Sequence, residues 1–184
     1  MKKFRMEQDS MGKVKVPQGV YYQAQTQRAL DNFQFSDRIF PHAIIFSLID
    51  IKACAADVNG ELGLLDKTLA EAIKTAASKA KDLDLRQNFP LDVFQTGSGT
   101  SSNMNVNEVL AKLAEDTIEQ QVHPNDHVNL GQSSNDVIPS AIQISAVRLL
   151  QNLYSAIKAL SNQLNHLASE HSDTVKTGRT HLMD

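Results

Sequence analysis

Apolar residues at alternating spacings of four and three form the longest regular pattern in the chain. They are Ala146, Leu150, Leu153, Ile157, Leu160, Leu164 and Leu167. This heptad pattern predicts one long helix with a continuous apolar stripe. Residues 133–136 (Ser-Ser-Asn-Asp) offer N-cap candidates for it, and Pro139 is expected in its first turn. Because a small domain cannot cover so long a stripe, we expect the helix to pack against other long helices, including those of other subunits.

Two shorter helices are predicted earlier in the chain. Between Pro41 and Gly60, apolar residues recur at helical spacing, and Lys52 falls among them. Residues 66–83 place alanines and leucines on one face and lysines on the other, which predicts an amphipathic helix. The first 40 residues lack such periodicity, so we expect an irregular arm with at most a short strand or hairpin.

These elements indicate a mainly α chain with two parts. We expect an N-terminal, mostly helical domain over residues 1–135, which begins with the short irregular or β arm. Residues 136–184 are expected to form the start of a helical bundle. No internal repeat and no linker divides the chain further.

The composition excludes several classes of function. The chain has 184 residues, with 18 Lys and Arg against 21 Asp and Glu, so it lacks the positive field that nucleic-acid binding requires. No segment reaches the roughly 20 consecutive apolar residues that cross a bilayer, so no membrane association is expected. The first ten residues lack the apolar core of a secretory signal, which favours a cytoplasmic protein. The single Cys54 is expected to be a small core residue.

The first polar segment that could carry chemistry is Thr96-Gly97-Ser98-Gly99-Thr100, which runs into a helical pattern. Backbone N–H groups at such a helix start, with the hydroxyls of Ser98 and Thr100, can hold a carboxylate or a phosphate. The same residues could simply cap the helix, and the two interpretations are about equally favoured. Nucleotide binding is disfavoured, because the Gly-Lys-[Ser/Thr] ending of a phosphate loop and the third glycine of a dinucleotide site are absent.

The second segment concentrates neutral polar groups between His123 and Asp136. Such groups are costly to bury without partners, and a ligand can supply those partners. A metal site at His123 and His127 is disfavoured, because Pro124 and Asn125 argue against the helix that would align the two imidazoles. We therefore expect no metal and no cofactor.

The third segment is Gly178-Arg179-Thr180-His181, near the end of the chain. A histidine after such a turn can carry a proton near neutral pH. It can also be an ordinary hydrogen-bonded residue, and the segment taken alone favours that interpretation.

Together, the three segments resemble the class II fumarate hydratases of the fumarase/aspartase superfamily. The resemblance rests on residues 96–108, on 123–136 and on 178–181, in that order along the chain. It extends over the N-terminal arm through Pro17, Tyr21, Gln25, Thr26 and Arg28. It implies the N-terminal domain of the fumarase/aspartase fold, followed by the start of its long-helix bundle. The implied activity is the reversible hydration of fumarate to L-malate.

The resemblance also implies roles for particular residues. Positions where the family binds the substrate carboxylates match Ser98, Thr100, Ser133, Ser134, Asn135 and Thr180. His181 matches the active-site histidine that handles the catalytic water or a proton, and it is the implied catalytic residue. A second dicarboxylate site near the active-site entrance is matched by His123, Asn125 and Asp126. The family assembles as a homotetramer in which each active site draws on three subunits.

Two features depart from the family pattern. Leu130 stands where many members carry Lys, which puts in doubt any cationic contribution from that position to carboxylate binding. The chain ends at Asp184, before the mobile loop that supplies the family's base. The parent protein is therefore expected to be the hydratase, and this chain alone is expected to hydrate fumarate negligibly.

Two other functions compete with the hydratase. An aspartate ammonia-lyase has the same fold and similar motifs, and a non-catalytic helical assembly module would account for the heptad stripe. The Gly-Ser-Gly-Thr and Gly-Arg-Thr-His sequences resemble the hydratase versions better, which favours the hydratase.

Overall fold

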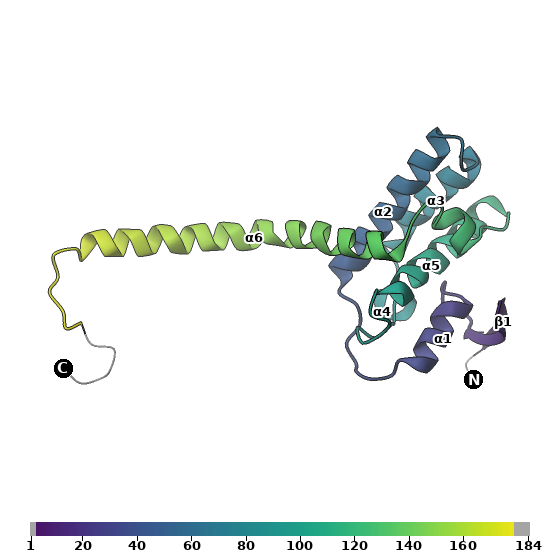
Figure 1. Cartoon of the computed structure of the whole chain (residues 1–184), viewed down its shortest axis with the longest axis horizontal. Helices are drawn as coiled ribbons and strands as arrows, with labels where there is room; N and C mark the ends of the chain where they lie inside the picture. The colour runs from purple at the N-terminus through teal and green to yellow at the C-terminus, as the bar shows by residue number, and fades with distance from the viewer. Residues whose placement is uncertain (1–2, 179–184) are drawn as a thin grey trace. The chain divides into compact units, whose positions relative to one another are not determined.

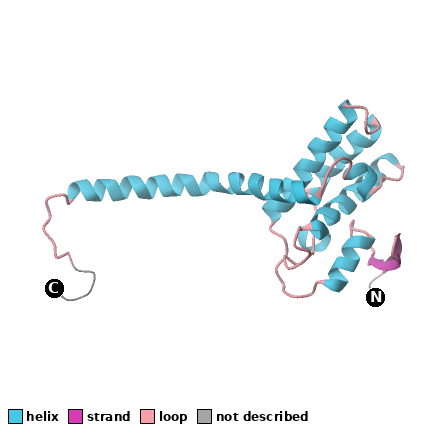
Figure 2. Cartoon of the chain, viewed as in Figure 1, coloured by secondary structure: helices cyan, strands magenta, loops and turns pink. Residues whose placement is uncertain are grey.

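A computed structural model describes residues 3–178 of the chain. Helices dominate this range, and an antiparallel hairpin lies near its N-terminus (Figure 2). The prediction of a mainly α chain that begins with a short β arm is confirmed.

The hairpin is built from β1 (Phe4–Asp9) and β2 (Gly12–Pro17), with Phe4 opposite Pro17 and Asp9 opposite Gly12. More and less exposed residues alternate along β1, as expected for a strand with one face on the protein. The Arg5 side chain holds the segment after β2 against the hairpin, because it donates to the carbonyl oxygens of Pro17, Val20 and Tyr22.

Helix α1 (Ala24–Asn32) lies within the arm, where the sequence predicts no helix. Its residues are mostly polar, and it buries only Ala24, Thr26 and Ala29. Tertiary contacts therefore stabilise it rather than an apolar face of its own. The chief contact is the carboxylate of Glu108, which accepts hydrogen bonds from backbone N–H groups at the start of the helix.

Helices α2 (His42–Glu61), α3 (Lys67–Ala80) and α5 (Thr100–Ile118) form the core and lie side by side (Figure 1). Gly60 allows α2 and α3 to approach closely, because a Cβ there would lie 3.0 Å from the Cβ of Ala70. The two helices predicted over residues 41–60 and 66–83 are confirmed. Cys54, expected in the core, is instead exposed, because it falls on the solvent side of α2. The core side chains of the three helices include Ile45, Leu48, Ile49, Ile73, Ala76, Val106, Val109 and Leu110.

Two short turns join the longer helices. They are α4 (Leu85–Asn88) and η1, a single π-helical turn over Pro124–Val128. The sequence prediction that Pro124 argues against a helix is wrong at this turn. Proline is tolerated at the first helical position, where its missing N–H would have no partner in any case.

Helix α6 (Ser134–Glu170) confirms the long helix predicted from the heptad pattern. Pro139 lies inside the helix, in its second turn rather than its first. The chain divides into two compact units, Met1–Ser145 and Ala146–Asp184, and α6 contributes residues to both. The domain boundary predicted after residue 135 stays a prediction.

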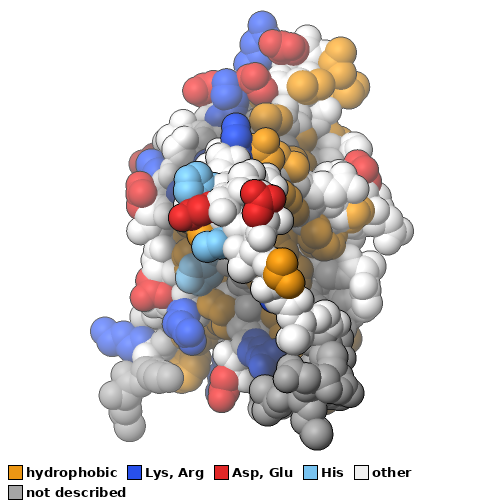
Figure 3. All heavy atoms as spheres, turned by 90° about the vertical axis from the view of Figure 1, so that its left-hand side faces the viewer, with side chains coloured by type: hydrophobic (Ala, Val, Ile, Leu, Met, Phe, Trp, Pro, Cys, Tyr) orange, Lys and Arg blue, Asp and Glu red, His pale blue; other side chains and the backbone are white. Residues whose placement is uncertain are grey.

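The second unit carries the heptad stripe. Its apolar side chains are largely exposed, with values from 40% for Leu167 to 60% for Leu160. In the space-filling view of Figure 3, exposed apolar side chains are seen among the charged ones. The exposed members of the stripe are Leu150, Leu153, Ile157, Leu160, Leu164 and Leu167.

Candidate active site

The start of α5 is shaped by Gly99, which precedes the first helical residue. Its φ of 67° lies in the left-handed region, which glycine adopts at no steric cost. A Cβ at this position would lie 3.1 Å from side-chain carbons of Ile138 in α6. The glycine therefore lets the start of α5 pack directly against the second turn of α6.

Hydroxyl groups surround this helix start. The Oγ of Ser98 and the Oγ1 of Thr100 are hydrogen-bonded to each other at 2.6 Å on the exposed side. Gly99 has no side chain to cap the helix, and the Oε1 of Gln95 accepts from the backbone N–H of Ser102 instead. Ser98 and Thr100 are thus not consumed as helix caps, which leaves them able to bind a ligand.

The start of α6 presents the second predicted set of donors. The Oγ of Ser133 accepts from the backbone N–H of Asn135 at 3.3 Å, so Ser133 caps the helix. The Oγ of Ser134 accepts from the Nδ2 of Asn103 in α5 at 3.0 Å. Ser133 and Asn135 are exposed, and Ser134 is half-buried.

Two contacts therefore join the starts of α5 and α6. One is the hydrogen bond between Asn103 and Ser134, and the other is the packing of Gly99 against Ile138. The structure thus brings together two sequence motifs that lie more than 30 residues apart. Helix N-termini carry a partial positive charge and unpaired N–H groups, so their convergence favours an anionic ligand.

A buried polar cluster of Lys52, Asn129 and Gln132 lies next to the start of α6. The side chain of Lys52 in α2 is completely buried, and its Nζ donates to the Oδ1 of Asn129 at 2.7 Å and to the Oε1 of Gln132 at 2.8 Å. Burial lowers the pKa of Lys52 from 10.5 to about 7, because the charged ammonium loses its hydration. The cluster contains amides and one amine, and both of these hydrogen bonds from the Lys52 Nζ go to amide oxygens rather than to a carboxylate.

The predicted second dicarboxylate site lies at η1. The Nδ1 of His123 accepts from the backbone N–H of Asp126 at 3.1 Å, and the Nδ1 of His127 accepts from the backbone N–H of His123 at 3.0 Å. Both Nδ1 atoms accept a backbone hydrogen bond, which in a neutral imidazole places the proton on Nε2, and the Nδ1 of His123 also lies 3.1 Å from the Oδ2 of Asp126. Each ring therefore has an Nε2–H group free to donate to a ligand.

A cavity of about 420 Å³ opens beside η1, and His123 and Asn125 line it. Asp126, the third predicted residue of this site, is not among the lining residues. The other walls come from β1, from the start of α1 and from the middle of α5.

Four carboxylates line the same cavity, yet each has a partner. Glu7 pairs with Arg5 at 2.6 Å, Asp9 with Arg28 at 2.8 Å and Glu115 with Lys112 at 2.9 Å. The fourth, Glu108, is 2% exposed and accepts from the backbone N–H groups of residues 23, 25 and 26 at 2.7–3.0 Å. Burial raises the pKa of Glu108, and these hydrogen bonds oppose that rise. Because each carboxylate already has an ion-pair or hydrogen-bond partner, the four together repel an anion in the cavity less than unpaired carboxylates would.

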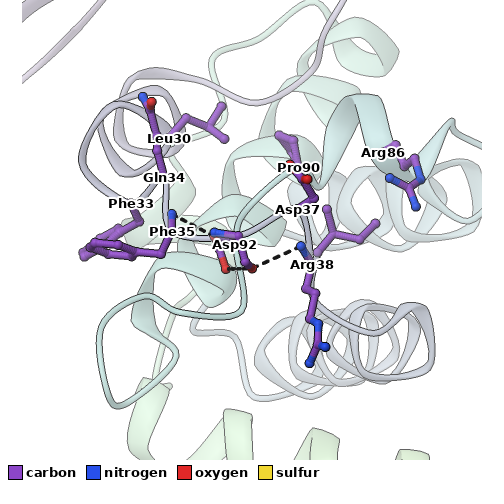
Figure 4. A pocket seen from close by; sticks show the side chains of 11 residues that line it. Leu30, Phe33, Gln34, Phe35, Asp37, Arg38, Arg86, Pro90 and Asp92 are labelled. Carbon is purple, nitrogen blue, oxygen red and sulfur yellow. Dashed lines mark hydrogen bonds between the residues drawn. The ribbon is translucent and has the colours of Figure 1, made fainter.

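A cavity of about 630 Å³ lies elsewhere and contains none of the predicted site residues. Figure 4 shows Phe33 and Phe35 on one side of it and Arg38 and Arg86 on the other. The carboxylate of Asp92 accepts from the backbone N–H groups of Phe35 and Ser36 and from the Ser36 hydroxyl. Asp92 thus holds the loop at Phe35 and Ser36 in place, and its carboxylate has few acceptor positions left for a ligand.

The remaining sequence predictions concern two residues near the C-terminus, a metal site and a membrane-spanning helix. Thr180 and His181 lie outside the described residues. Within residues 3–178, no group of three or more His, Cys, Asp and Glu side chains is placed to hold a metal ion. No helix in the same range combines the length and apolarity that crossing a bilayer requires.

Sequence reasoning missed Lys52 and Glu108 as parts of the site. For Lys52 a signal existed, since it falls at a helical spacing otherwise occupied by apolar residues. For Glu108 the signal was weaker. It follows a run of buried polar and apolar positions in α5, but nothing in the sequence indicates the backbone groups that it binds.

Comparison with known proteins places this geometry in context. A model of the lyase family matches residues 12–184. The chain is 52% identical over 183 residues to the class II fumarate hydratase of Xylella fastidiosa (strain 9a5c), a match that covers 99% of this chain and 39% of the relative. The chain therefore spans about two fifths of the length of that curated relative.

Two solved structures resemble the chain. One is the class II fumarase from Schistosoma mansoni, with a TM-score of 0.74, 46% identity, and coverage of 78% of this chain and 32% of that one. The other is the fumarate lyase:delta crystallin from Brucella melitensis in native form. Its TM-score is 0.85 at 37% identity, and the match covers 99% of this chain and 44% of that one.

Proposed function

The chain belongs to the lyase family, and from this premise we propose that the protein carrying it catalyses the reversible hydration of fumarate to L-malate. The observation that carries the proposal is the convergence of the α5 and α6 starts. Through the Asn103–Ser134 hydrogen bond and the Gly99–Ile138 contact, it sets two groups of uncharged donors side by side. The similarity to class II fumarate hydratases supports the same conclusion.

The chemistry explains why uncharged donors suit this reaction. Removal of the C3 proton of malate leaves a carbanion whose charge spreads onto the adjacent C4 carboxylate, and the C2 hydroxyl, protonated by a general acid, then departs as water. Fixed donors aimed at that carboxylate stabilise the developing charge, and each is worth about 100-fold to 1,000-fold in rate. We assign this role to Ser98, Thr100, Ser133, Ser134 and Asn135.

Thr180 and His181 complete the proposed active site. By resemblance, Thr180 binds the substrate carboxylate, and His181 handles the catalytic water or a proton. An imidazole suits this task, because its ordinary pKa lies near neutral pH. No metal or cofactor is part of the proposal.

The turn at His123, Asn125 and Asp126 is proposed as a second dicarboxylate site. The Nε2–H of His123 and the paired state of the carboxylates in the neighbouring cavity support this assignment. The test is to titrate the protein with L-malate and to follow the chemical shift of the His123 Nε2 by NMR.

The proposed function is tested by assaying fumarate hydration in the gene product that carries this sequence. Thr100→Val removes one hydroxyl while it keeps the branched side chain, and we expect kcat/KM to fall about 100-fold to 1,000-fold. Ser78→Ala is the matched control, because this exposed hydroxyl lies on α3 and belongs to neither motif. Wild-type protein without malate or fumarate turnover would overturn the proposal.

Two rival functions give different results in the same experiment. An aspartate ammonia-lyase would release ammonia from aspartate without turning over malate. A non-catalytic assembly module would lose nothing measurable on His181→Asn, whereas a hydratase would lose turnover.

The remaining expectations concern the whole protein. We propose that it assembles as a homotetramer in which the apolar stripe of α6 is covered by other long helices. The exposure of that stripe supports this arrangement. A cytoplasmic location remains a prediction from the sequence.

A further inference from the structure

Lys52 stands out among the buried polar residues of the first compact unit. Its side chain is 0% exposed, yet it lies on the apolar face of α2 and carries an amine. Placing such a group in the interior is costly unless its hydrogen bonds are made. Lys52 therefore calls for an explanation beyond core packing, and its partners supply one.

Both partners of the Lys52 Nζ belong to the turn that precedes α6. The Oδ1 of Asn129 lies at 2.7 Å and the Oε1 of Gln132 at 2.8 Å. A neutral amine has two N–H groups, so these two acceptors satisfy both of its donors. The low pKa of about 7 is consistent with an amine that is largely neutral in mildly alkaline solution.

The turn itself is held by a connected set of amide bonds. The Oδ1 of Asn129 also accepts from the Nδ2 atoms of Asn103 and Asn107, each at 3.3 Å. The Nδ2 of Asn129 donates to the Gln132 carbonyl oxygen at 3.1 Å, and Gln132 donates to the Val128 carbonyl oxygen at 3.0 Å. Asn129 is thus the point where α2, α5 and the turn meet.

The same bonds reach the proposed substrate donors. Asn103, which donates to Asn129, also donates to the Oγ of Ser134. Gln132 is followed directly by Ser133, which caps α6. Any shift of the 129–132 turn must therefore move the start of α6 and the hydroxyls that it presents.

We propose that Lys52 is a positioning residue that fixes the 129–132 turn and so orients Ser133, Ser134 and Asn135 toward a substrate carboxylate. This inference rests on the proposed function. Lys52 touches no reacting atom and acts only through Asn129 and Gln132. The alternative is that Lys52 merely fills the core, in which case its loss would lower stability without altering how substrate binds.

The test compares Lys52→Met with wild type in the gene product that carries this sequence. Methionine keeps the length and apolar stem of the side chain but removes both donors. We expect KM for fumarate to rise at least fivefold and kcat/KM to fall at least tenfold. Destabilisation alone reduces the number of active molecules, so it lowers the apparent kcat and leaves KM unchanged.

Ile73→Val is the matched control. It removes one methylene from a fully buried side chain in α3, which does not form part of the cluster. We expect kcat/KM within twofold of wild type for this variant. Equal losses in Lys52→Met and Ile73→Val at the same melting temperature would overturn the proposal, as would a folded Lys52→Met with unchanged KM.

A second variant covers the case in which Lys52→Met does not fold. Gln132→Leu removes one of the two acceptors from a half-buried position, so the core is less disturbed. We expect a three- to tenfold loss in kcat/KM. Wild-type kinetics in a folded Gln132→Leu would overturn the positioning role.

Hydrogen exchange separates failure of this inference from failure of the proposed function. In the 184-residue chain, Lys52→Met should accelerate amide exchange over residues 128–135 at least tenfold, while Ile73→Val should not. If the wild-type gene product hydrates no fumarate, the proposed function fails, and this measurement alone decides whether Lys52 fixes the turn. Unchanged exchange over residues 128–135 would then refute it.

Discussion

At the scale of single residues, the burial of Lys52 creates a pH dependence of stability. Its pKa is about 7 in the folded chain and 10.5 as the ordinary value. Between these values the unfolded chain holds more protons than the folded one, so the free energy of unfolding rises with pH. Below pH 7 the full penalty of burying the charge is present, and above pH 10.5 it has vanished. The whole rise amounts to about 5 kcal/mol.

This dependence is measured as a difference between wild type and Lys52→Met. Urea unfolding of the 184-residue chain, followed by far-ultraviolet circular dichroism, is repeated at pH 7 and pH 9. We expect the wild type to gain about 2 kcal/mol relative to the variant over this interval. A constant difference between the two proteins would show that the folded chain keeps Lys52 charged in this range.

The sequence identified the polar residues of the candidate site unevenly. Ser98, Thr100 and Ser133 could be proposed from the sequence, because hydroxyls close to glycines at a predicted helix start have a recognisable pattern. Lys52 could not be assigned a role, since its partners Asn129 and Gln132 lie about 80 residues further along the chain. Only the packing of α2 against α5 and η1 brings the three together.

At the scale of elements, the contact between α5 and α6 depends on Gly99. An alanine there would have to adopt a φ of 67° and would place its Cβ 3.1 Å from Ile138. We expect Gly99→Ala to lower the free energy of unfolding by about 1–3 kcal/mol, through backbone strain and displacement of α6. In the gene product it should also lower kcat/KM, because the two donor groups would separate.

Gly97→Ala provides the control two residues earlier. A Cβ at Gly97 would have no atom within 4 Å, and its φ is not in the left-handed region. We expect a change within about 0.5 kcal/mol for this variant. Similar stability of the two variants in thermal unfolding would contradict the role assigned to Gly99.

Long elements were easier to predict than short ones. Helices α2, α3 and α6 have apolar faces that repeat over several turns, so their periodicity is visible in the sequence. Helix α1 was missed because it buries small and polar side chains, which give no apolar periodicity. The backbone N–H groups at its start donate to the carboxylate of Glu108, which lies 82 to 85 residues away in the sequence. The turn at η1 was missed because proline was read as a breaker, although it occupies the first position.

At the scale of the whole molecule, the apolar stripe of α6 governs association. Its leucine and isoleucine side chains are between 40% and 60% exposed. We expect the 184-residue chain to self-associate, with the mean mass in light scattering rising across a concentration series. Ile157→Glu should shift this rise to higher concentration, because it places a charge on the stripe.

The control for this prediction lies on the other side of the helix. Ser155 is exposed and, at 100° per residue, falls opposite the centre of the stripe. Ser155→Glu adds the same charge and should leave the mass distribution unchanged. A single monomeric species for wild type at every concentration would rule out self-association through this surface.

The hydroxyl pair at Ser98 and Thr100 has a consequence for ligand affinity. While one hydroxyl donates to the other at 2.6 Å, only one of their two protons is left to point outward. An incoming carboxylate draws on that outer proton, and the inner hydroxyl polarises its neighbour and strengthens the new bond. The two side chains therefore share one outward donor between them, and the losses from truncating each alone should not add up to the loss from truncating both.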